Sequence, residues 1–380
     1  MKTAKGPVSI SPGRWQKIAG DAQAFVPNPL PPPITWSPEL VHALSDADRL
    51  LGRLAGEGRR LPNPHLLIRP FVRREAVLSS RIEGTQATLG ELLASEAGAA
   101  VDRSPDDLRE VGNYVVALEY GIERLKSLPL SLRLICELHK KLMHGVRGGQ
   151  AAPGEFRRTQ NWIGRPGSTI STATYIPTPP DELMNCLGAW ETFLHDKKLP
   201  PLIHVALAHY QFEAVHPFLD GNGRVGRLLI SLFLIERGIL PVPLLYLSAF
   251  FEASRRDYYD NLLGVTRRGA WNEWLIYFLN GVARQSEDAI SRSERINQLL
   301  SDWRELVAGT PSQAPLKVLD RIAANPFVTI RGLEKALKTS YNTAARAVEL
   351  LMKKGVLSPV KAEARRDRVF CAKALLQILE

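Results

Sequence analysis

Residues 216 to 227, HPFLDGNGRVGR, place a histidine, an aspartate and two arginines around three glycines. Gly221, Gly223 and Gly226 have the spacing G-x-G-x-x-G, which is typical of a dinucleotide-binding turn. Such a loop could bind the cofactor of a redox enzyme. It could equally hold phosphate groups beside a catalytic base, and the residues around the glycines distinguish these two chemistries.

The segments that flank the glycines do not suit a dinucleotide site. Such a turn directly follows a strand and has an acidic residue about 20 positions further on. Here residues 202–215 have helical periodicity, Pro217 ends them, and the first acidic residue after the loop is Glu236, on the same predicted helix. A Walker loop is excluded as well, because no Gly-Lys-Ser/Thr follows.

What remains is a glycine-rich loop between two predicted helices, with side chains suited to phosphate chemistry. Glycine N–H groups at a helix N-terminus form an anion site, and Arg224 and Arg227, three residues apart, share one helix face. Asp220 suits Mg²⁺, and His216 suits the base for a hydroxyl that attacks a phosphate. Each residue alone has an ordinary structural explanation, but together within twelve residues they favour a phosphate-handling site.

The elements that must position this loop are predicted to be mainly α-helical. Helices are expected over residues 37–58, 70–84, 104–126, 180–195, 200–218 and 224–238. Ser37 and Ser104 are the expected N-caps of two of them, and Pro70 is expected to open another. Residues 153–180 are short β-branched or aromatic segments among Gly and Pro, which indicates a small β-hairpin, and the proline-rich residues 26–36 indicate an extended arm.

The glycine loop resembles the Fic (Fido) family. From His216 to Arg227 the chain matches the signature H-x-F-x-[DE]-G-N-G-R-x-x-R at every specified position. The predicted hairpin is similar to the family's flap, and residues 246–263 look like the helix whose paired tyrosines border the adenine. The resemblance covers about residues 30–300. It implies an N-terminal arm and inhibitory-helix region at 1–100 and a Fic catalytic core at 101–300.

The resemblance implies transfer of AMP from ATP to a Ser, Thr or Tyr hydroxyl of a target protein, with Mg²⁺. His216 would be the catalytic base, Asp220 would hold the metal, and Phe218 would anchor the loop. The target segment would pair with the flap as an added strand. The residues implied to bind the nucleotide are Glu83, Thr172, Ala173, Thr174, Tyr175, Gly221, Asn222, Gly223, Arg224, Val225, Gly226, Arg227, Tyr258 and Tyr259.

Glu83 is expected at the C-terminal end of its helix, which Gly84 stops, where the helix dipole disfavours an anion. A residue in a locally unfavourable position can indicate function. The indication is weak here, because surface glutamates tolerate such positions. The resemblance adds that Ser79, Glu83 and Gly84 match the inhibitory motif [S/T]-x-x-x-E-[G/N] of the family. In such members the glutamate pairs with the second arginine, here Arg227, and in some it supports removal of AMP.

The last segment carries much of the positive charge. Residues 310–380 hold 13 lysines and arginines against 6 aspartates and glutamates, a difference of +7 within a net charge of +10. Three predicted helices, with Thr329 and Ser340 (or Thr339) as N-caps and Gly355 as a stop, are followed by a ribbon. The segment resembles a winged helix-turn-helix with residues 341–355 as recognition helix and 363–370 as wing. Duplex DNA and a docking or dimer surface are both open as partners.

The rest of the composition is that of a soluble globular protein, with 45% hydrophobic and 23% charged residues. Three scattered cysteines fit a reducing compartment, and no apolar run is long enough to cross a bilayer, so a cytoplasmic protein without a membrane partner is expected. Two alternatives to the adenylyltransferase are a DNA-binding regulator whose Fic body senses a nucleotide, and an enzyme that moves another phosphate-containing group. The intact His216, Asp220 and Arg224 favour an enzyme. The target protein and the oligomeric state, including a homodimer, stay open.

Overall fold

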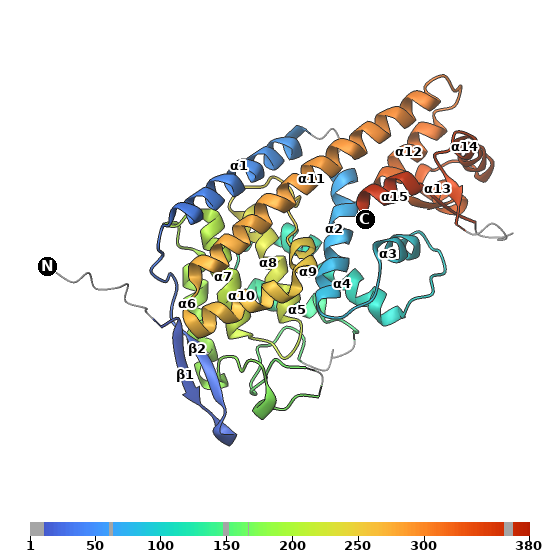
Figure 1. Cartoon of the computed structure of the whole chain (residues 1–380). Coiled ribbons are helices and arrows are strands. Elements are labelled where there is room, and N and C mark those ends of the chain that lie inside the picture. The colour runs from blue at the N-terminus through green and yellow to red at the C-terminus, as the bar shows by residue number, and fades with distance from the viewer. Residues whose placement is uncertain (1–10, 61–63, 147–151, 166, 361–367) are drawn as a thin grey trace.

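The structure is a computed structural model that describes residues 11–60, 64–146, 152–165, 167–360 and 368–380. Helices dominate it, as the sequence predicts (Figure 1). They are α1 (Pro38–Arg60), α2 (Pro64–Ile82), α3 (Leu89–Glu96), α4 (Pro105–Arg124), α5 (Leu132–Leu142), α6 (Pro180–Leu194), α7 (Pro201–Val215), α8 (Asn222–Glu236), α9 (Ser248–Ala253), α10 (Arg255–Arg268), α11 (Trp271–Val307), α12 (Ala314–Ala324), α13 (Ile330–Leu337), α14 (Tyr341–Lys353) and α15 (Lys373–Leu379).

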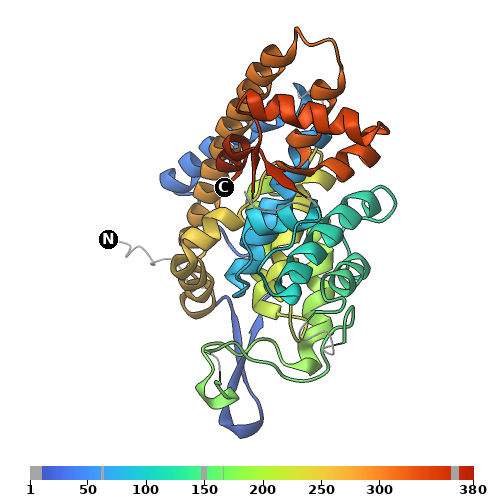
Figure 2. The same ribbon diagram turned by 90° about the vertical axis from the view of Figure 1, so that its right-hand side faces the viewer.

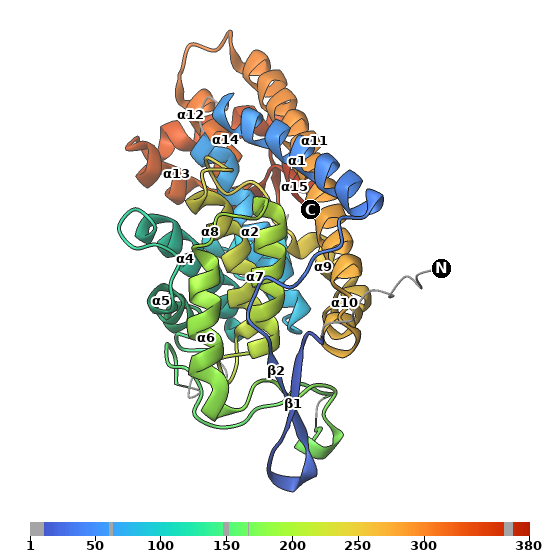
Figure 3. The same ribbon diagram turned by 90° about the vertical axis from the view of Figure 1, so that its left-hand side faces the viewer.

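The centre of the fold is α7, which is apolar on all sides and buried along nearly its whole length. A helix that is hydrophobic all round has to lie inside a bundle. It packs against α6 and α8, which flank it in Figure 3, and against α10 and α11. Since α7 ends at the glycine loop and α8 begins there, the tightly packed core holds both ends of the loop.

The helix that leads to Glu83 begins earlier than the sequence predicts. Pro70 was expected to open it, but α2 starts at Pro64 and contains Pro70 in its interior. A proline inside a helix removes one N–H donor, and here the helix continues through that loss to Ile82. Ser37 precedes α1 and caps it as expected, since its Oγ accepts from Leu40 N. Ser104 stands at the expected N-cap position of α4, but its side chain makes no capping hydrogen bond.

The predicted hairpin over 153–180 is not formed as two strands in the described part of that segment. Its one β-type pairing is an isolated antiparallel bridge between Ile163 and Tyr175. Local turns take up the polar groups between them: Thr169 and Thr172 close the 3-10 helix η2 (Ile170–Thr172), and Trp162 Nε1 donates to the Ser168 carbonyl. These local bonds compete with a strand ladder, so the flap is a braced loop.

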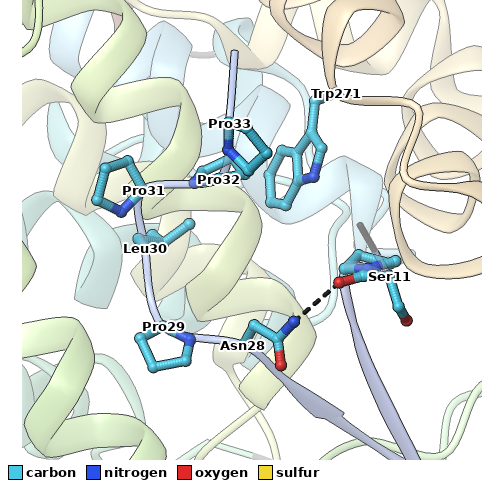
Figure 4. A pocket seen from close by; sticks show the side chains of 9 residues that line it. Ser11, Asn28, Pro29, Leu30, Pro31, Pro32, Pro33 and Trp271 are labelled. Atoms are coloured by element: carbon cyan, nitrogen blue, oxygen red, sulfur yellow. Dashed lines mark hydrogen bonds between the residues drawn. The ribbon is translucent and has the colours of Figure 1, made fainter. Parts of the chain in front are cut away.

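A hairpin does occur near the N-terminus, where the sequence reasoning had none. Strands β1 (Gly13–Lys17) and β2 (Gln23–Pro27) pair antiparallel and project from the helical body (Figures 1 and 3). The proline-rich stretch that follows has no regular structure, as expected of an extended arm. Its residues Pro31 and Pro33 lie with Trp271 around a pocket (Figure 4).

The C-terminal segment packs on the N-terminal part of the body (Figure 2). It contains α12 to α15 and a three-stranded sheet in the order β3 (Phe327–Thr329), β5 (Val369–Cys371), β4 (Ser358–Pro359). The expected caps are confirmed: Thr329 accepts from Gly332 N, Ser340 accepts from Thr343 N, and Gly355 ends α14 with a positive φ of 73°. Most of the expected wing lies outside the described residues, and the winged-helix assignment stays a prediction.

Most buried hydrophobic residues of the body and of the C-terminal segment form one continuous cluster, from Leu40 to Leu379, and a second, smaller cluster holds Val26, Leu183, Cys186, Leu187 and Val215. Contacts of α12 and α15 with α2 join the C-terminal segment to the body within the larger cluster. The domain limits at residues 100 and 310 therefore stay predictions. Among the described residues, none of the helices combines the length and the apolar character needed to cross a membrane.

Candidate active site

His216 directly follows α7 and turns the chain into the glycine loop. Its backbone is left-handed, with φ 51° and ψ 63°, which non-glycine residues rarely adopt. Its N–H donates to the Phe212 carbonyl at 2.9 Å, and its carbonyl accepts from Arg157 Nε at 2.9 Å. Pro217 prevents the helix from continuing. The unusual conformation is therefore held by specific bonds, as is common at functional sites.

The imidazole of His216 is half-buried, with Nδ1 3.3 Å from the Glu213 carbonyl oxygen. Because a carbonyl only accepts, Nδ1 carries the proton and Nε2 is the basic nitrogen. Burial, and then the charge of Arg157, lower the pKa of His216 to about 4. The ring is neutral near pH 7, which is the form that a general base requires.

The loop after His216 is anchored by Phe218 and Asn222. Phe218 is fully buried, and its ring stacks on the His139 ring with 3.8 Å between centroids. Asn222 Oδ1 accepts from Phe218 N at 2.8 Å, and Asn222 Nδ2 donates to the Phe218 carbonyl at 2.8 Å. The anchoring role expected of Phe218 agrees with this packing. The Asn222 side chain braces the loop through these two bonds, and its expected contact with the nucleotide stays a prediction.

Asp220 and Arg224 face each other at the start of α8. Asp220 Oδ1 accepts from Gly221 N at 2.6 Å, and its side chain is 52% exposed. Arg224 is 5% exposed, with Nη2 3.7 Å from Asp220 Oδ1 and Nη1 3.6 Å from Glu110 Oε2. Its Nε and Nη1 have no hydrogen-bond partner within the described part of the chain. Buried donors of this kind fit a site that an anion completes.

Arg227, one turn further along α8, is bound by the end of α2. Its Nε donates to Ser79 Oγ at 2.9 Å, and its Nη2 donates to the Ser79 carbonyl at 3.0 Å and to Glu83 Oε1 at 2.6 Å. Burial tends to raise the pKa of Glu83, but the charge and the hydrogen bond of Arg227 outweigh it and lower that pKa. The two side chains therefore form a charged pair, and Arg227 is not free to bind a phosphate.

Gly223 and Gly226, in the first turns of α8, leave room for the carboxylates of Glu83 and Glu213. A Cβ added at Gly223 would overlap Glu83 Oε1, and one added at Gly226 would overlap Glu213 Oε1. Gly221, the N-cap of α8, needs its positive φ of 78°. Val225, also assigned to the nucleotide, is fully buried in the core.

Two family models match the chain, the Fic/DOC family N-terminal model over residues 41–123 and the Fic/DOC family model over residues 129–234. The second includes His216, the glycine loop and most of α8. The chain belongs to the Fic/DOC family.

Curated relatives match part of the chain. The proteins named protein adenylyltransferase Fic from Drosophila grimshawi and Drosophila virilis are each 34% identical to it over 167 residues. Each match covers 42% of this chain and 32% of the relative. The chain thus spans about a third of the length of the curated relatives it matches.

Solved structures share the fold. A Fic family protein from Desulfovibrio desulfuricans superimposes with a TM-score of 0.59 at 20% identity, over 90% of this chain and 98% of that one. A Fic domain containing signaling protein from Bacteroides thetaiotaomicron gives a TM-score of 0.50 at 22% identity, over 66% of this chain and 95% of that one. These likenesses show a Fic fold for the chain.

The flap residues predicted for the Fic site divide into exposed and buried ones. Thr172 and Thr174 are exposed and Ala173 is half-buried. Tyr175 is buried, and its hydroxyl donates to the Ala214 carbonyl at 2.6 Å. Its ring therefore fastens the flap to α7, and the residues before it remain for a nucleotide or a target segment.

The paired tyrosines of the predicted nucleotide site also separate. Tyr258 is 1% exposed, and its hydroxyl lies 2.9 Å from His209 Nε2, so it belongs to the core. Tyr259 is 37% exposed and lies close enough to Glu83 and Arg227 for both charges to act on its pKa, which burial raises to about 12. Of the two rings, the structure leaves Tyr259 available beside the site.

Sequence reasoning missed the residues that hold the Fic loop from outside it. Arg157, which is 4% exposed, binds the carbonyls of Val215, His216 and Thr178. His139 Nδ1 accepts from Gly154 N at 2.8 Å, so its Nε2 donates to the Asp220 carbonyl at 3.0 Å. Both lie far from the motif in sequence, and nothing in their spacing pointed to it.

Proposed function

We propose that this Fic protein transfers AMP from ATP to a Ser, Thr or Tyr hydroxyl of a target protein. The observation that carries the proposal is that one loop joins a neutral His216, just after α7, to the incompletely bonded Arg224 guanidinium in the first turn of α8. The first suits a base and the second suits a phosphate. The name of the curated relatives, protein adenylyltransferase Fic, supports the same reaction.

The chemical step uses His216 Nε2 to take the proton of the target hydroxyl. The hydroxyl oxygen then forms a bond to the α-phosphorus of ATP, and the bond from that phosphorus to the oxygen bridging to the β-phosphate breaks. Pyrophosphate leaves with the electron pair. Arg224 would hold the negative charge on the phosphates, together with the N–H groups at the first turn of α8.

Asp220 fits the Mg²⁺ expected of such a reaction. Its carboxylate is 52% exposed and lies beside the first turn of α8. The described residues contain no group of three or more His, Cys, Asp or Glu that could hold a metal by themselves. Mg²⁺ is commonly bound by one or two carboxylates together with substrate phosphates, so one aspartate is sufficient. When bound, the ion would neutralise charge that develops on the phosphates.

Glu83 would act as a brake on this reaction. It occupies Arg227, which in the proposed active state would bind the terminal phosphate of ATP. The charged pair is strong and directional, because Arg227 is 2% exposed. Removal of AMP from a target with help from the same glutamate is a second activity that this geometry supports.

The other partners follow from surface features. The exposed Thr172 and Thr174 support pairing of a target segment with the flap. The +7 charge of residues 310–380 supports nucleic acid as a partner of the C-terminal segment. A reducing, intracellular compartment is supported by the three free thiols, Cys136, Cys186 and Cys371.

The test is the fate of labelled ATP. Incubated with lysate proteins, the chain is expected to attach label from the α-phosphate of ATP and none from the γ-phosphate. His216→Ala should abolish this labelling while ATP binding, measured by calorimetry, stays within about threefold, since the base contributes to the reaction and not to nucleotide affinity. Undiminished labelling by that variant would reject His216 as the base, and γ-label on the target would make the protein a kinase.

A further inference from the structure

A buried carboxylate outside the proposed reaction lies two turns before Glu83 on the same helix. Glu75 is 2% exposed. Its Oε1 accepts from Tyr114 Oη of α4 at 2.9 Å and from Ser248 Oγ at 2.5 Å, and its Oε2 accepts from Ser248 N at 3.3 Å. Ser248 is the first residue of α9. One carboxylate thus ties α2 to two other helices, which lie around it in Figure 1.

The spacing connects Glu75 with the contact to Arg227. Glu75, Ser79 and Glu83 follow one another at intervals of four, and residues four apart lie on one face of a helix. Ser79 binds Arg227 Nε and Glu83 binds Arg227 Nη2. A rotation or shift of α2 that broke the bonds of Glu75 would move both of these partners away from Arg227.

The polar groups between the two sites form a chain. Burial and the neighbouring Glu75 raise the pKa of the Tyr114 phenol, and a side-chain hydrogen bond with Ser79 opposes that rise. Tyr114 donates to Glu75 and is close enough to Ser79 for that side chain to act on its pKa, and Ser79 in turn accepts from Arg227 Nε. Burial also raises the pKa of Glu75, against the hydrogen bonds of Ser248 and Tyr114.

Burying a carboxylate in a protein core costs free energy. An apolar side chain of similar size would avoid the cost of removing a charge from water, and such replacements are often neutral or stabilising when the whole polar set is replaced. An apolar contact, however, has no preferred direction, whereas a hydrogen bond does. Three directional hydrogen bonds from α4 and α9 favour one rotation and one axial position of α2, in addition to the apolar packing around it.

We propose that Glu75 is a positioning residue that holds α2 in the register at which Ser79 and Glu83 bind Arg227. This inference rests on the proposed function, since the effect of losing the register is release of the brake. The hydrogen bonds of Glu75 come from Tyr114 and Ser248, which lie outside the proposed active site. Glu75 acts through the pair of Glu83 and Arg227.

The chain offers a matched pair of variants for the test. Tyr114→Phe removes a hydroxyl that donates to Glu75 at 2.9 Å. Tyr120→Phe removes a hydroxyl on the same helix that donates to Glu137 at 2.8 Å, away from Arg227. Glu75→Leu removes all three bonds, and Glu75→Gln keeps a carbonyl oxygen that can accept from Tyr114 and Ser248.

The measurement is the initial rate of AMP incorporation at saturating ATP, with and without Glu83→Gly. In the otherwise unchanged chain, Glu75→Leu and Tyr114→Phe are expected to raise the rate at least threefold, Glu75→Gln less, and Tyr120→Phe not at all. With Glu83→Gly present, none of the four should raise it further, because the charged pair of Glu83 and Arg227, which is the brake, is already absent.

The outcomes separate this inference from the proposed function. If Glu83→Gly raises the rate and Glu75→Leu and Tyr114→Phe only lower the melting temperature, Glu75 is a core residue and the inference is wrong. If they raise the rate equally with and without Glu83→Gly, Glu75 acts elsewhere. If Glu75→Leu fails to fold, Tyr114→Phe decides in its place. If Glu83→Gly itself leaves a measurable rate unchanged, the proposed brake fails and the inference fails with it. If no variant incorporates AMP, the proposed reaction is wrong.

Discussion

Arg227 Nη2 donates to Glu83 Oε1 at 2.6 Å, although 144 residues separate the two in the chain. The arginine is 2% exposed and the glutamate side chain 34%, so the pair is shielded on one side and reaches solvent on the other. Burial would lower the pKa of Arg227, but the negative charge of Glu83 raises it. Breaking the pair therefore requires a competing anion for the arginine, and a nucleotide phosphate has that charge.

Glu83→Gly is expected to raise the initial rate of AMP incorporation about thirtyfold, if the arrangement in which Glu83 binds Arg227 is favoured by about 2 kcal/mol. The physical reason is that Arg227 becomes free for the terminal phosphate. The melting temperature should not rise, since the change leaves a buried guanidinium without its charged partner. Equal rates of the two proteins at saturating ATP would reduce Glu83 to a surface residue at a helix end.

Arg227→Ala is the control for that result. It removes the brake and the phosphate clamp together, so its rate should stay at or below that of the unchanged chain. A rate as high as that of Glu83→Gly would mean that Arg227 has no part in binding ATP.

The pH dependence of the rate tests the state of His216. Its pKa, lowered to about 4 by burial, lies below the ordinary histidine value of 6.5. A base works when it is neutral, and a lowered pKa keeps it neutral until the pH falls to about 4. The rate constant of Glu83→Gly at saturating ATP should therefore change less than about twofold from pH 7.5 to 5.5, whereas an ordinary histidine would lose roughly tenfold.

Glu213 is the control for this profile. Burial raises its pKa to about 7, so it titrates inside the same window, close to Arg227 and Glu83. If the rate constant of Glu83→Gly falls with pH and that of Glu83→Gly combined with Glu213→Gln does not, the fall is assigned to Glu213. A tenfold fall in both would give His216 an ordinary pKa.

Much of the helical framework follows from local sequence signals. Ser37, Thr329 and Ser340 cap helices as their residue types predict, because a side-chain oxygen at that position satisfies an N–H that the helix leaves free. The motif at 216–227 also predicted a glycine-rich loop that opens a helix, and α8 begins there at Asn222. Such features depend on neighbours within four residues, which a sequence displays directly.

The misses depend on partners that are distant in sequence. Pro70 is typical of a helix start, but packing of α2 against α4 and α9 keeps it inside the helix. Tyr258 and Tyr259 are adjacent and chemically alike, and it is contact with His209 and Phe251 that distinguishes the buried Tyr258. Arg157 and Glu75 carry no motif, and their importance comes from the carbonyls and hydroxyls that the fold brings to them.

Gly226→Ala tests the packing between α7 and α8. A Cβ at this position would overlap Glu213 Oε1 and approach His209 Cε1 to 3.3 Å. Helix propensity favours alanine by about 1 kcal/mol, but overpacking costs about 1–3 kcal/mol, so the free energy of unfolding should fall or stay level. Adding Glu213→Ala should restore it, because the overlapping oxygen is gone. If Gly226→Ala alone is stabilised by the full helical gain, Glu213 does not occupy that space.

The C-terminal segment offers a prediction that depends on charge alone. If residues 310–380 bind duplex DNA, each phosphate neutralised releases counterions, and the logarithm of the affinity falls linearly with the logarithm of the salt concentration. Arg346, Lys353 and Lys354 are exposed on or just after α14. With the whole chain and a labelled random duplex, Arg346→Ala should weaken binding at every sequence and reduce the salt slope by about 1.

Lys126→Ala is the matched control, since Lys126 is a 71% exposed cation of the helical body. It should leave both the affinity and the slope unchanged if the C-terminal segment makes the contacts. Equal losses from Arg346→Ala and Lys126→Ala would indicate attraction by the overall positive charge, with no defined DNA surface. Absence of salt-dependent binding to the duplex would instead make the segment a surface for protein docking or dimerisation, because its net positive charge would then have no nucleic-acid partner.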